Sequence, residues 1–262
     1  MFCIHIRLGL SSGMSDTNST TESLPQKTRW LDQLDDAAAM AVMAEDQQLA
    51  VAAVEASIES ITQAATAVYE KLKAHPESRL FYAGAGTSIR IGVQDGVELS
   101  PTFDWPEDRT GFIIAGGEAA LTRSVENAED DAETAAAIIK TRVTPNDVLI
   151  GIAASGTTPF TISAIEAASR LGALTIGVAN NADTPLTARA DYGIALLTGA
   201  ESVAGSTRMK AGTAQKICLN LISTLVMVRM GRVQNGVMSA MRPANAKLRD
   251  RQKRIDAFLK RD

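Results

Sequence analysis

The sequence has few of the residues on which metal sites and disulfide frameworks depend. Its 262 residues include two cysteines and two histidines. Cys3 lies near the start of the chain and Cys218 lies in an apolar helical pattern, so we expect no disulfide and a reducing compartment. His5 and His75 belong to no cluster with metal-ligand spacing. We therefore expect no metal and no cofactor, and chemistry carried by carboxylates, hydroxyl groups and backbone dipoles.

The chain also lacks an excess of positive charge and a long apolar run. Lys and Arg number 26 against 30 Asp and Glu, which gives a formal charge of -4 at pH 7. A basic face for nucleic acid or for an acidic membrane is therefore not expected. No apolar run approaches the roughly 18 residues of a membrane span, and the apolar start lacks a basic leader and a small-residue cleavage site. We expect a cytoplasmic protein.

Composition divides the chain into four parts. Residues 1–28 are rich in Ser and Thr toward their end and predict a mobile tail. Residues 29–75 predict a helical arm. Because 35–73 lack Gly and Pro and carry apolar residues at alternating spacings of three and four, we expect one long helix there with these residues in one stripe. That stripe comprises Val51, Val54, Ile58, Ile61, Ala65, Val68 and Leu72. Its cover is either the rest of the chain or a second copy.

The next part, residues 76–233, contains short apolar runs that alternate with loops and helical patterns. The runs span residues 80–83, 111–115, 148–152, 174–178 and 192–196. Because they are apolar throughout, they predict parallel strands covered on both faces. The expected fold is α/β, a three-layer αβα sandwich with a five-stranded, mainly parallel sheet. Residues 207–230 predict a long buried helix, and the basic segment 234–262 predicts an exposed C-terminal helix.

Three loops rich in Gly, Ser and Thr follow or precede these elements. They are Gly84-Ala-Gly-Thr-Ser88, Ala154-Ser-Gly-Thr-Thr-Pro159 and Gly205-Ser-Thr-Arg-Met-Lys210. One such loop is typical of an ordinary turn or helix cap. Several at the carboxyl ends of parallel strands favour an anion site built from amides and hydroxyl groups. No nucleotide-binding glycine pattern is present. We predict a phosphorylated small molecule, held by Gly86, Thr87, Ser88, Ser155, Gly156, Thr157, Thr158, Ser206, Thr207 and Lys210.

Several longer strings resemble one known family. They are Thr21-Glu-Ser-Leu, Met43-Ala-Glu-Asp-Gln, Pro101-Thr-Phe103, Ile114-Ala-Gly-Gly-Glu-Ala-Ala120, Glu126-Asn-Ala-Glu-Asp-Asp131, Gly151-Ile-Ala-Ala-Ser-Gly156, Gly205-Ser-Thr-Arg-Met-Lys-Ala-Gly-Thr-Ala-Gln-Lys216 and Asn245-Ala-Lys-Leu-Arg-Asp250. Together with the first loop, they resemble the N-acetylmuramic acid 6-phosphate etherases of the sugar-isomerase (SIS) superfamily. The resemblance implies the SIS fold, a phosphosugar substrate and a homodimer with composite sites.

The family's reaction releases D-lactate from carbon 3 of the amino sugar. By resemblance, the proton donor falls on Glu98 and the second catalytic carboxylate on Glu129. Glu118 is a third candidate for substrate contact and is equally typical of a charge at a helix N-terminus. Surface carboxylates remain the alternative for Glu98 and Glu129. A non-catalytic sugar-phosphate regulator and an isomerase of another phosphosugar are the alternative functions.

Two features complicate the resemblance. In a straight helix from residue 88 to 98, Glu98 would lie about 15 Å from the first loop. Either Gly92 or Gly96 ends that helix early, or Glu98 serves a site shared with a second subunit. In addition, Ile89 stands where the family usually has Gly, which predicts a changed loop, and Thr157 stands where it commonly has Arg, which removes a cation.

Overall fold

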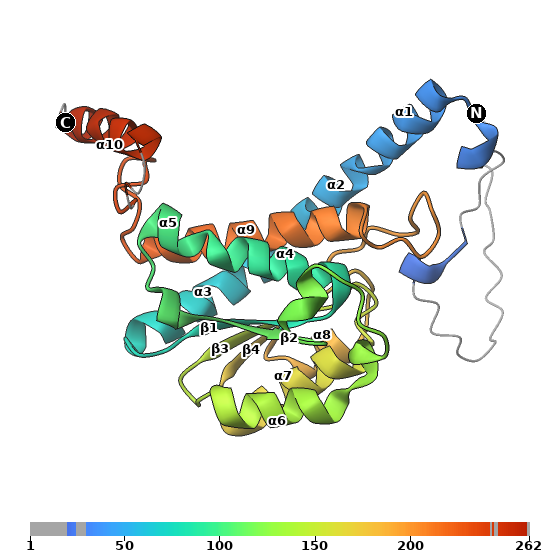
Figure 1. The fold of residues 1–262 in the computed structure, drawn as a ribbon, viewed down its shortest axis with the longest axis horizontal. Helices are drawn as coiled ribbons and strands as arrows, with labels where there is room; N and C mark the ends of the chain where they lie inside the picture. The colour runs from blue at the N-terminus through green and yellow to red at the C-terminus, as the bar shows by residue number, and fades with distance from the viewer. Residues whose placement is uncertain (1–19, 25–29, 242, 244–245, 261–262) are drawn as a thin grey trace, which may run out of the picture.

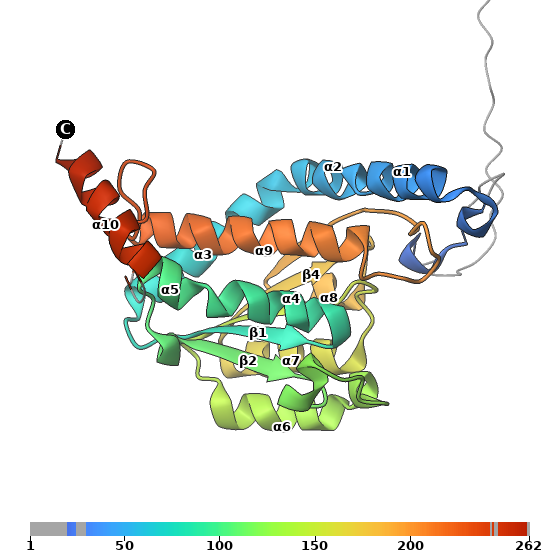
Figure 2. The same cartoon turned by 45° about the horizontal axis from the view of Figure 1, so that its top comes forward.

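The computed structural model describes residues 20–24, 30–241, 243 and 246–260. It contains one five-stranded sheet in the order β2-β1-β3-β4-β5, with all neighbouring strands parallel. The strands are β1 (Leu80–Gly84), β2 (Thr110–Ile114), β3 (Val148–Ile152), β4 (Leu174–Ala179) and β5 (Tyr192–Ala195). Figures 1 and 2 show helices on both faces of this sheet. The α/β three-layer fold expected from the apolar runs is confirmed.

The central strand β1 is apolar because its two faces pack into two different cores. In β1, Tyr82 belongs to the core under α3 (Ile58–Ala74), α4 (Gly86–Val97) and α9 (Lys210–Arg229). Its neighbours Phe81 and Ala83 belong to the core under α6 (Ala132–Arg142), α7 (Pro159–Leu171) and α8 (Pro185–Arg189). Alternating side chains point to opposite faces of a strand. Both cores are therefore needed to hold one strand in place.

The N-terminal arm is three helices rather than the single long helix we predicted. It comprises α1 (Asp36–Asp46), α2 (Gln48–Ala56) and α3, with joints at Gln47 and Ser57. The Ser57 hydroxyl donates to the carbonyls of Ala53 and Ala195, both at 2.9 Å, so the bend is tied to the end of β5. Five residues of the predicted stripe are buried, whereas Val51 and Ile58 are exposed. Figure 1 shows α1 and α2 extending away from the sheet.

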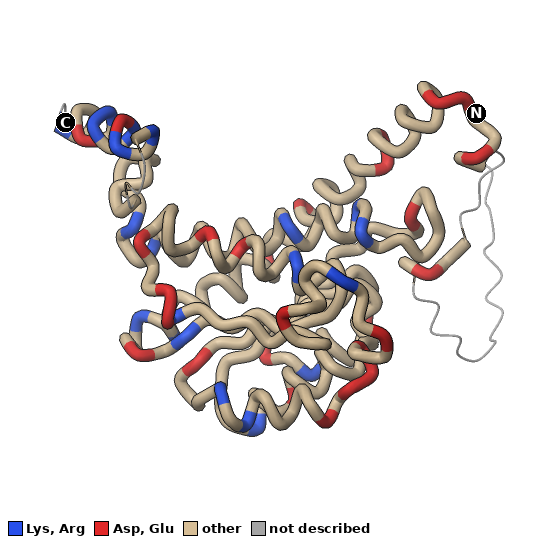
Figure 3. Tube along the Cα trace, viewed as in Figure 1, with Lys and Arg blue, Asp and Glu red and all other residues tan. Residues whose placement is uncertain are grey.

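Helix α9 is the central helix of the outer layer. Among the described helices, it alone is long and apolar enough to cross a membrane, and 56% of that stretch is buried inside the protein. It packs against α2, α3 and α4. The exposed C-terminal helix that we predicted corresponds to α10 (Ala246–Leu259), in which Ile255 is the buried residue. Figure 3 shows Lys and Arg gathered along it.

Short helices complete the described chain. They are η1 (Thr20–Glu22), η2 (Leu31–Gln33), α5 (Leu99–Phe103), η3 (Glu107–Arg109), η4 (Glu118–Leu121) and η5 (Ala128–Asp130). Most of the tail predicted for residues 1–28 lies outside the described residues, but η1 lies within it and is held against the protein by Asn181.

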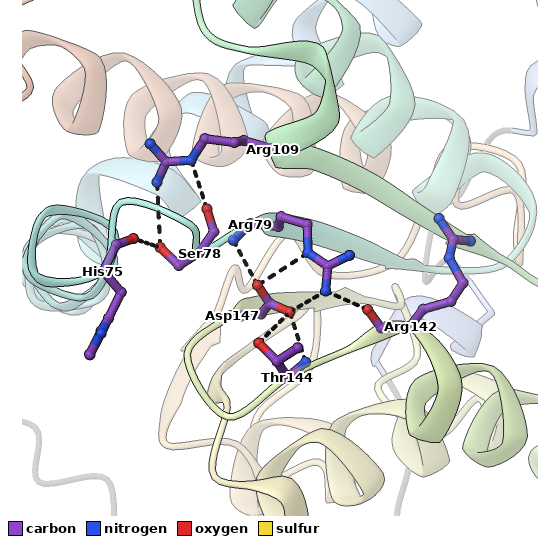
Figure 4. A network of polar contacts seen from close by, with 7 residues as sticks. All are labelled: His75, Ser78, Arg79, Arg109, Arg142, Thr144 and Asp147. Carbon is purple, nitrogen blue, oxygen red and sulfur yellow. Dashed lines mark hydrogen bonds and ion pairs between the residues drawn. The ribbon is translucent and has the colours of Figure 1, made fainter.

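At the amino edge of the sheet, the buried carboxylate of Asp147 joins the two strands β1 and β3 (Figure 4). It accepts hydrogen bonds from the backbone and guanidinium nitrogens of Arg79 at 2.7 and 2.8 Å, and from the amide and hydroxyl of Thr144 at 2.8 and 3.0 Å. Burial opposes ionisation of this group, but these hydrogen bonds outweigh burial and lower its pKa. Because Arg79 precedes β1 and Asp147 precedes β3, the contact sets the relative position of the two central strands.

Candidate active site

A polar cavity of about 370 Å³ lies at the carboxyl ends of β1 and β3. The helices that follow these strands, α4 and α7, cover opposite faces of the sheet, so their N-termini diverge around this point. This is where ligands bind in open parallel sheets. The cavity is lined by Glu22, Ala85, Gly86, Thr87, Ser88, Arg90, Ser124, Glu129, Ile152, Ala153, Ala154, Ser155, Thr158 and Thr207.

The first loop turns directly from β1 into α4. Gly86 is the first residue of α4 and has φ +53°, a conformation that a side chain would strain. Thr87 and Ser88 then place two hydroxyl groups in the first turn, beside backbone amides that have no partner within the helix. The positive end of the α4 dipole and these donors form a site suited to a phosphate group.

The second loop brings two more hydroxyl groups to the same cavity. Ser155 and Thr158 line it, and Thr158 is the N-cap residue of α7. Gly156 has φ +72°, and a Cβ there would lie 2.4 Å from the Thr184 side chain, so only glycine fits. Thr157 is exposed and does not line the cavity.

The third loop contributes less than we predicted. Thr207 lines the cavity, but Ser206 and Lys210 do not. The Lys210 side chain is 2% exposed, and its ammonium group lies 2.9 Å from the Asp46 carboxylate at the end of α1. The ion pair between Lys210 and Asp46 therefore joins the arm to α9, and Lys210 does not supply positive charge to a ligand.

The N-terminus of α9 is occupied by a carboxylate of the protein itself. Buried Glu201 accepts hydrogen bonds from the amides of Lys210 and Ala211 at 3.2 and 3.0 Å. Burial raises the pKa of Glu201, while the two amides lower it in part. A ligand phosphate therefore has the N-termini of α4 and α7 open to it, and not that of α9.

Of the three candidate carboxylates, Glu129 is the one that lines the cavity. It lies in η5, and its Oε1 is 3.4 Å from the position that a Cβ on Gly86 would take. The missing side chain of Gly86 thus leaves the carboxylate facing the first loop. Glu118 is exposed at the start of η4 and does not line the cavity.

Glu98 lies at the opposite end of α4. The helix runs unbroken through Gly92 and Gly96, so the early end that we considered does not occur. These glycines instead allow close packing, because a Cβ on Gly96 would lie 2.6 Å from the Phe112 ring and one on Gly92 would lie 3.2 Å from Tyr82 Cβ. At 1.5 Å per residue, exposed Glu98 is about 18 Å along the helix from Gly86.

Sequence reasoning did not select three polar residues of the cavity: Glu22, Arg90 and Ser124. The Arg90 guanidinium donates to the carbonyls of Ala120 and Leu121 at 2.8 and 3.1 Å, and so holds the loop that leads to Ser124 and Glu129. Arg90 could have been selected from the sequence, because it lies in the first turns of α4, two residues after Ser88. For Glu22, the signal was the Thr-Glu-Ser string of the family resemblance.

The two departures from the family pattern have different outcomes. Ile89 has helical rather than positive φ and is buried in the core under α4, so it does not disturb the first loop. Thr157 leaves the second loop without a cation, and the arginine that lines the cavity is Arg90 instead. Within the described residues, no group of three or more His, Cys, Asp or Glu side chains is arranged to hold a metal ion.

Comparison with known proteins agrees with this architecture. The model of the SIS domain matches residues 121–225, and that of the glucokinase regulatory protein N-terminal SIS domain matches residues 60–169. Solved phosphoheptose isomerases share the fold at low identity. The one from Francisella tularensis has a TM-score of 0.53 and 18% identity, covering 71% of this chain and 94% of its own. The one from Neisseria gonorrhoeae has a TM-score of 0.53 and 16% identity, covering 74% and 98%.

Curated relatives are much more similar in sequence. The N-acetylmuramic acid 6-phosphate etherase of Deinococcus radiodurans is 45% identical over 243 residues, which is 92% of this chain and 79% of the relative. That of Symbiobacterium thermophilum is 45% identical over 235 residues, or 90% and 78%. Identity of this level over most of both proteins shows common membership. The chain belongs to the N-acetylmuramic acid 6-phosphate etherase family.

Proposed function

We propose that this protein cleaves the D-lactyl ether at carbon 3 of N-acetylmuramic acid 6-phosphate, giving N-acetylglucosamine 6-phosphate and D-lactate. This is a lyase reaction of amino sugar metabolism in cell-wall recycling. The observation that carries the proposal is the presence of Glu129 beside Gly86 in a cavity lined by hydroxyl groups, in a chain of this family.

The substrate phosphate binds between the first two loops. Ser88, Ser155 and Thr158 donate their hydroxyls, and the free amides at the N-termini of α4 and α7 add charge-assisted hydrogen bonds. Arg90 contributes a positive charge at the same wall, although its guanidinium is already bonded to loop carbonyls. These groups hold a dianion without placing a lysine in the cavity.

The phosphate fixes the sugar so that its carbon chain passes Glu129. In the open-chain sugar, the aldehyde at carbon 1 acidifies the hydrogen at carbon 2, which Glu129 removes as a base. The bond between carbon 3 and the ether oxygen then breaks, and a general acid protonates the departing lactate. Water adds to the double bond, its hydroxyl at carbon 3 and its proton at carbon 2. The general acid of this scheme is Glu98.

Because Glu98 lies about 18 Å along α4 from the first loop of its own chain, it acts in the site of a second copy. We therefore propose a homodimer with two composite sites. Exposed apolar side chains support an interface on these helices: Val97 on α4 is 52% exposed, and Leu221 and Val228 on α9 are 40% and 42% exposed. The arm also exposes apolar residues, including Met40 in α1, a helix without a buried residue.

We place this reaction in the cytoplasm, where phosphorylated sugars are retained and where Cys218 stays a free thiol. The test is release of D-lactate from N-acetylmuramic acid 6-phosphate by the pure protein, followed with a D-lactate dehydrogenase. Binding without conversion would contradict the proposal and favour a regulator. Conversion without lactate would contradict it and favour an isomerase.

A further inference from the structure

A short N-terminal segment, residues 20–23, forms part of the cavity wall although it is far from the cavity in sequence. We name it the N-terminal strap. The Asn181 side chain holds it, since its Oδ1 accepts from the Thr20 hydroxyl at 2.8 Å and from the Thr21 amide at 3.2 Å. Its Nδ2 donates to the Thr21 hydroxyl at 3.0 Å. Thr21 is fully buried by these contacts.

The same amide group also fastens the second loop of the cavity. Nδ2 of Asn181 donates to the carbonyl of Ala154 at 3.0 Å, next to Ser155. Asn181 is 4% exposed, so water does not compete well for these bonds. One side chain therefore sets the position of the strap relative to the loop that carries the Ser155 hydroxyl.

The strap directs Glu22 toward the ligand space. Glu22 lines the cavity, and its Oε2 lies 3.5 Å from the position that a Cβ on Gly205 would take. Glu129 stands in the same relation to Gly86 in the first loop. The cavity thus has two carboxylates, each beside a glycine, in addition to the hydroxyl groups of the first two loops. No hydrogen bond or ion pair to another described residue engages the Glu22 carboxylate.

We propose that Glu22 is a substrate-binding residue that accepts hydrogen bonds from hydroxyl or amide N–H groups of the sugar, and that Asn181 is its positioning residue. An ionised carboxylate can only accept hydrogen bonds, so neutral donors of the sugar match it and a phosphate does not. Repulsion between like charges disfavours a phosphate placed directly beside Glu22. The sugar hydroxyls then face Glu22. This assignment rests on the proposed phosphosugar substrate.

The test compares two ligands that share a phosphate but differ in the sugar. Calorimetry would measure the binding of N-acetylglucosamine 6-phosphate and of inorganic phosphate to the full-length protein. In E22A, affinity for the sugar phosphate should fall about tenfold or more, as for loss of a hydrogen bond to a charged group, while affinity for inorganic phosphate stays within about twofold. E22Q should recover part of the loss, because the glutamine oxygen still accepts. D32N, a charge change in η2 at a residue that does not line the cavity, is the matched control and should bind both ligands normally.

Asn181 is tested by combining variants. N181A should weaken sugar-phosphate binding, and E22A should add little to N181A, because Glu22 already lacks its position there. Additive losses would overturn the positioning role. Unchanged sugar-phosphate binding in E22A, or an equal loss for both ligands, would overturn the role of Glu22. These binding measurements do not require turnover. If the protein binds these ligands but releases no D-lactate, the proposed function is refuted, and the binding data still test the role of Glu22.

Discussion

Mixing two inactive variants tests whether the catalytic carboxylates of one site come from two chains. E98Q and E129Q each remove one of the two proton-transfer groups while keeping the side-chain size. Each homodimer should lose at least about 100-fold in kcat, as expected for loss of a general acid or base. In the structure, Glu129 lies at the first loop and Glu98 at the far end of α4, so one chain does not bring them together.

A mixed dimer restores one complete site if the sites are composite. The chain with E98Q keeps its own Glu129 and receives Glu98 from its partner, whereas the other site carries both substitutions. With random pairing, about half of the dimers are mixed and each has one intact site of two, so about a quarter of wild-type activity should return.

The assay is D-lactate release from equal amounts of the two variants, coexpressed with different affinity tags and purified through both. Material selected in this way is all mixed dimer and should show about half of the wild-type activity. The control pairs E129Q with a chain that carries both substitutions, and should remain inactive. If the mixed dimer of E98Q and E129Q releases D-lactate no faster than the single-variant homodimers, the composite site is refuted. In that case the two chains do not combine Glu98 of one with Glu129 of the other in one active site.

Four further predictions concern single positions. S155A should raise KM for the sugar phosphate about fivefold with a smaller change in kcat, by loss of one phosphate donor, and steady-state kinetics would show this. D147N should reduce the free energy of unfolding by about 2 kcal/mol at neutral pH. Because the pKa of Asp147 is lowered in the folded state, this loss of stability should shrink as the pH falls below the ordinary value of 3.8. Urea melts of both proteins at several pH values test this, and a loss that does not change with pH would contradict it. Burial, with a smaller contribution from Asp95, raises the pKa of Cys218 to about 12, so this thiol should not react with a disulfide reagent at pH 8 until the protein unfolds. G96A should lower the melting temperature by several degrees, since its Cβ would meet the Phe112 ring; an unchanged melting curve would contradict the packing role given to Gly96.

Local pattern was sufficient for the sheet and insufficient for the arm. The run at residues 148–152 matches β3 to the residue, because a strand covered on both faces needs only apolar side chains. The break at Ser57 depends on a hydrogen bond to Ala195, which is 138 residues away. No window of sequence contains both partners, so the stripe pattern predicts a continuous helix there.

The candidate site shows the same limit. Thr87, Ser88, Ser155 and Thr158 could be selected because each lies directly at a strand-helix junction, where geometry follows from the fold. Lys210 was selected on its charge, yet its surroundings include Asp46 from the arm. Glu22 was not selected because its position in the cavity wall depends on Asn181, which follows β4 and is far from Glu22 in sequence.

The contact between Asp147 and Arg79 stabilises the sheet at its amino edge, whereas the candidate active site lies at its carboxyl edge. Asp147 and Arg79 join the central strands at the rim farthest from the cavity. The opposite rim is assembled from the strap and loops that arrive from distant parts of the chain. Substitutions at the carboxyl edge, where the cavity lies, can therefore change substrate preference while the fold stays the same. Substitutions of Asp147 or Arg79 at the amino edge would lower the stability of the whole protein without changing which sugar it binds.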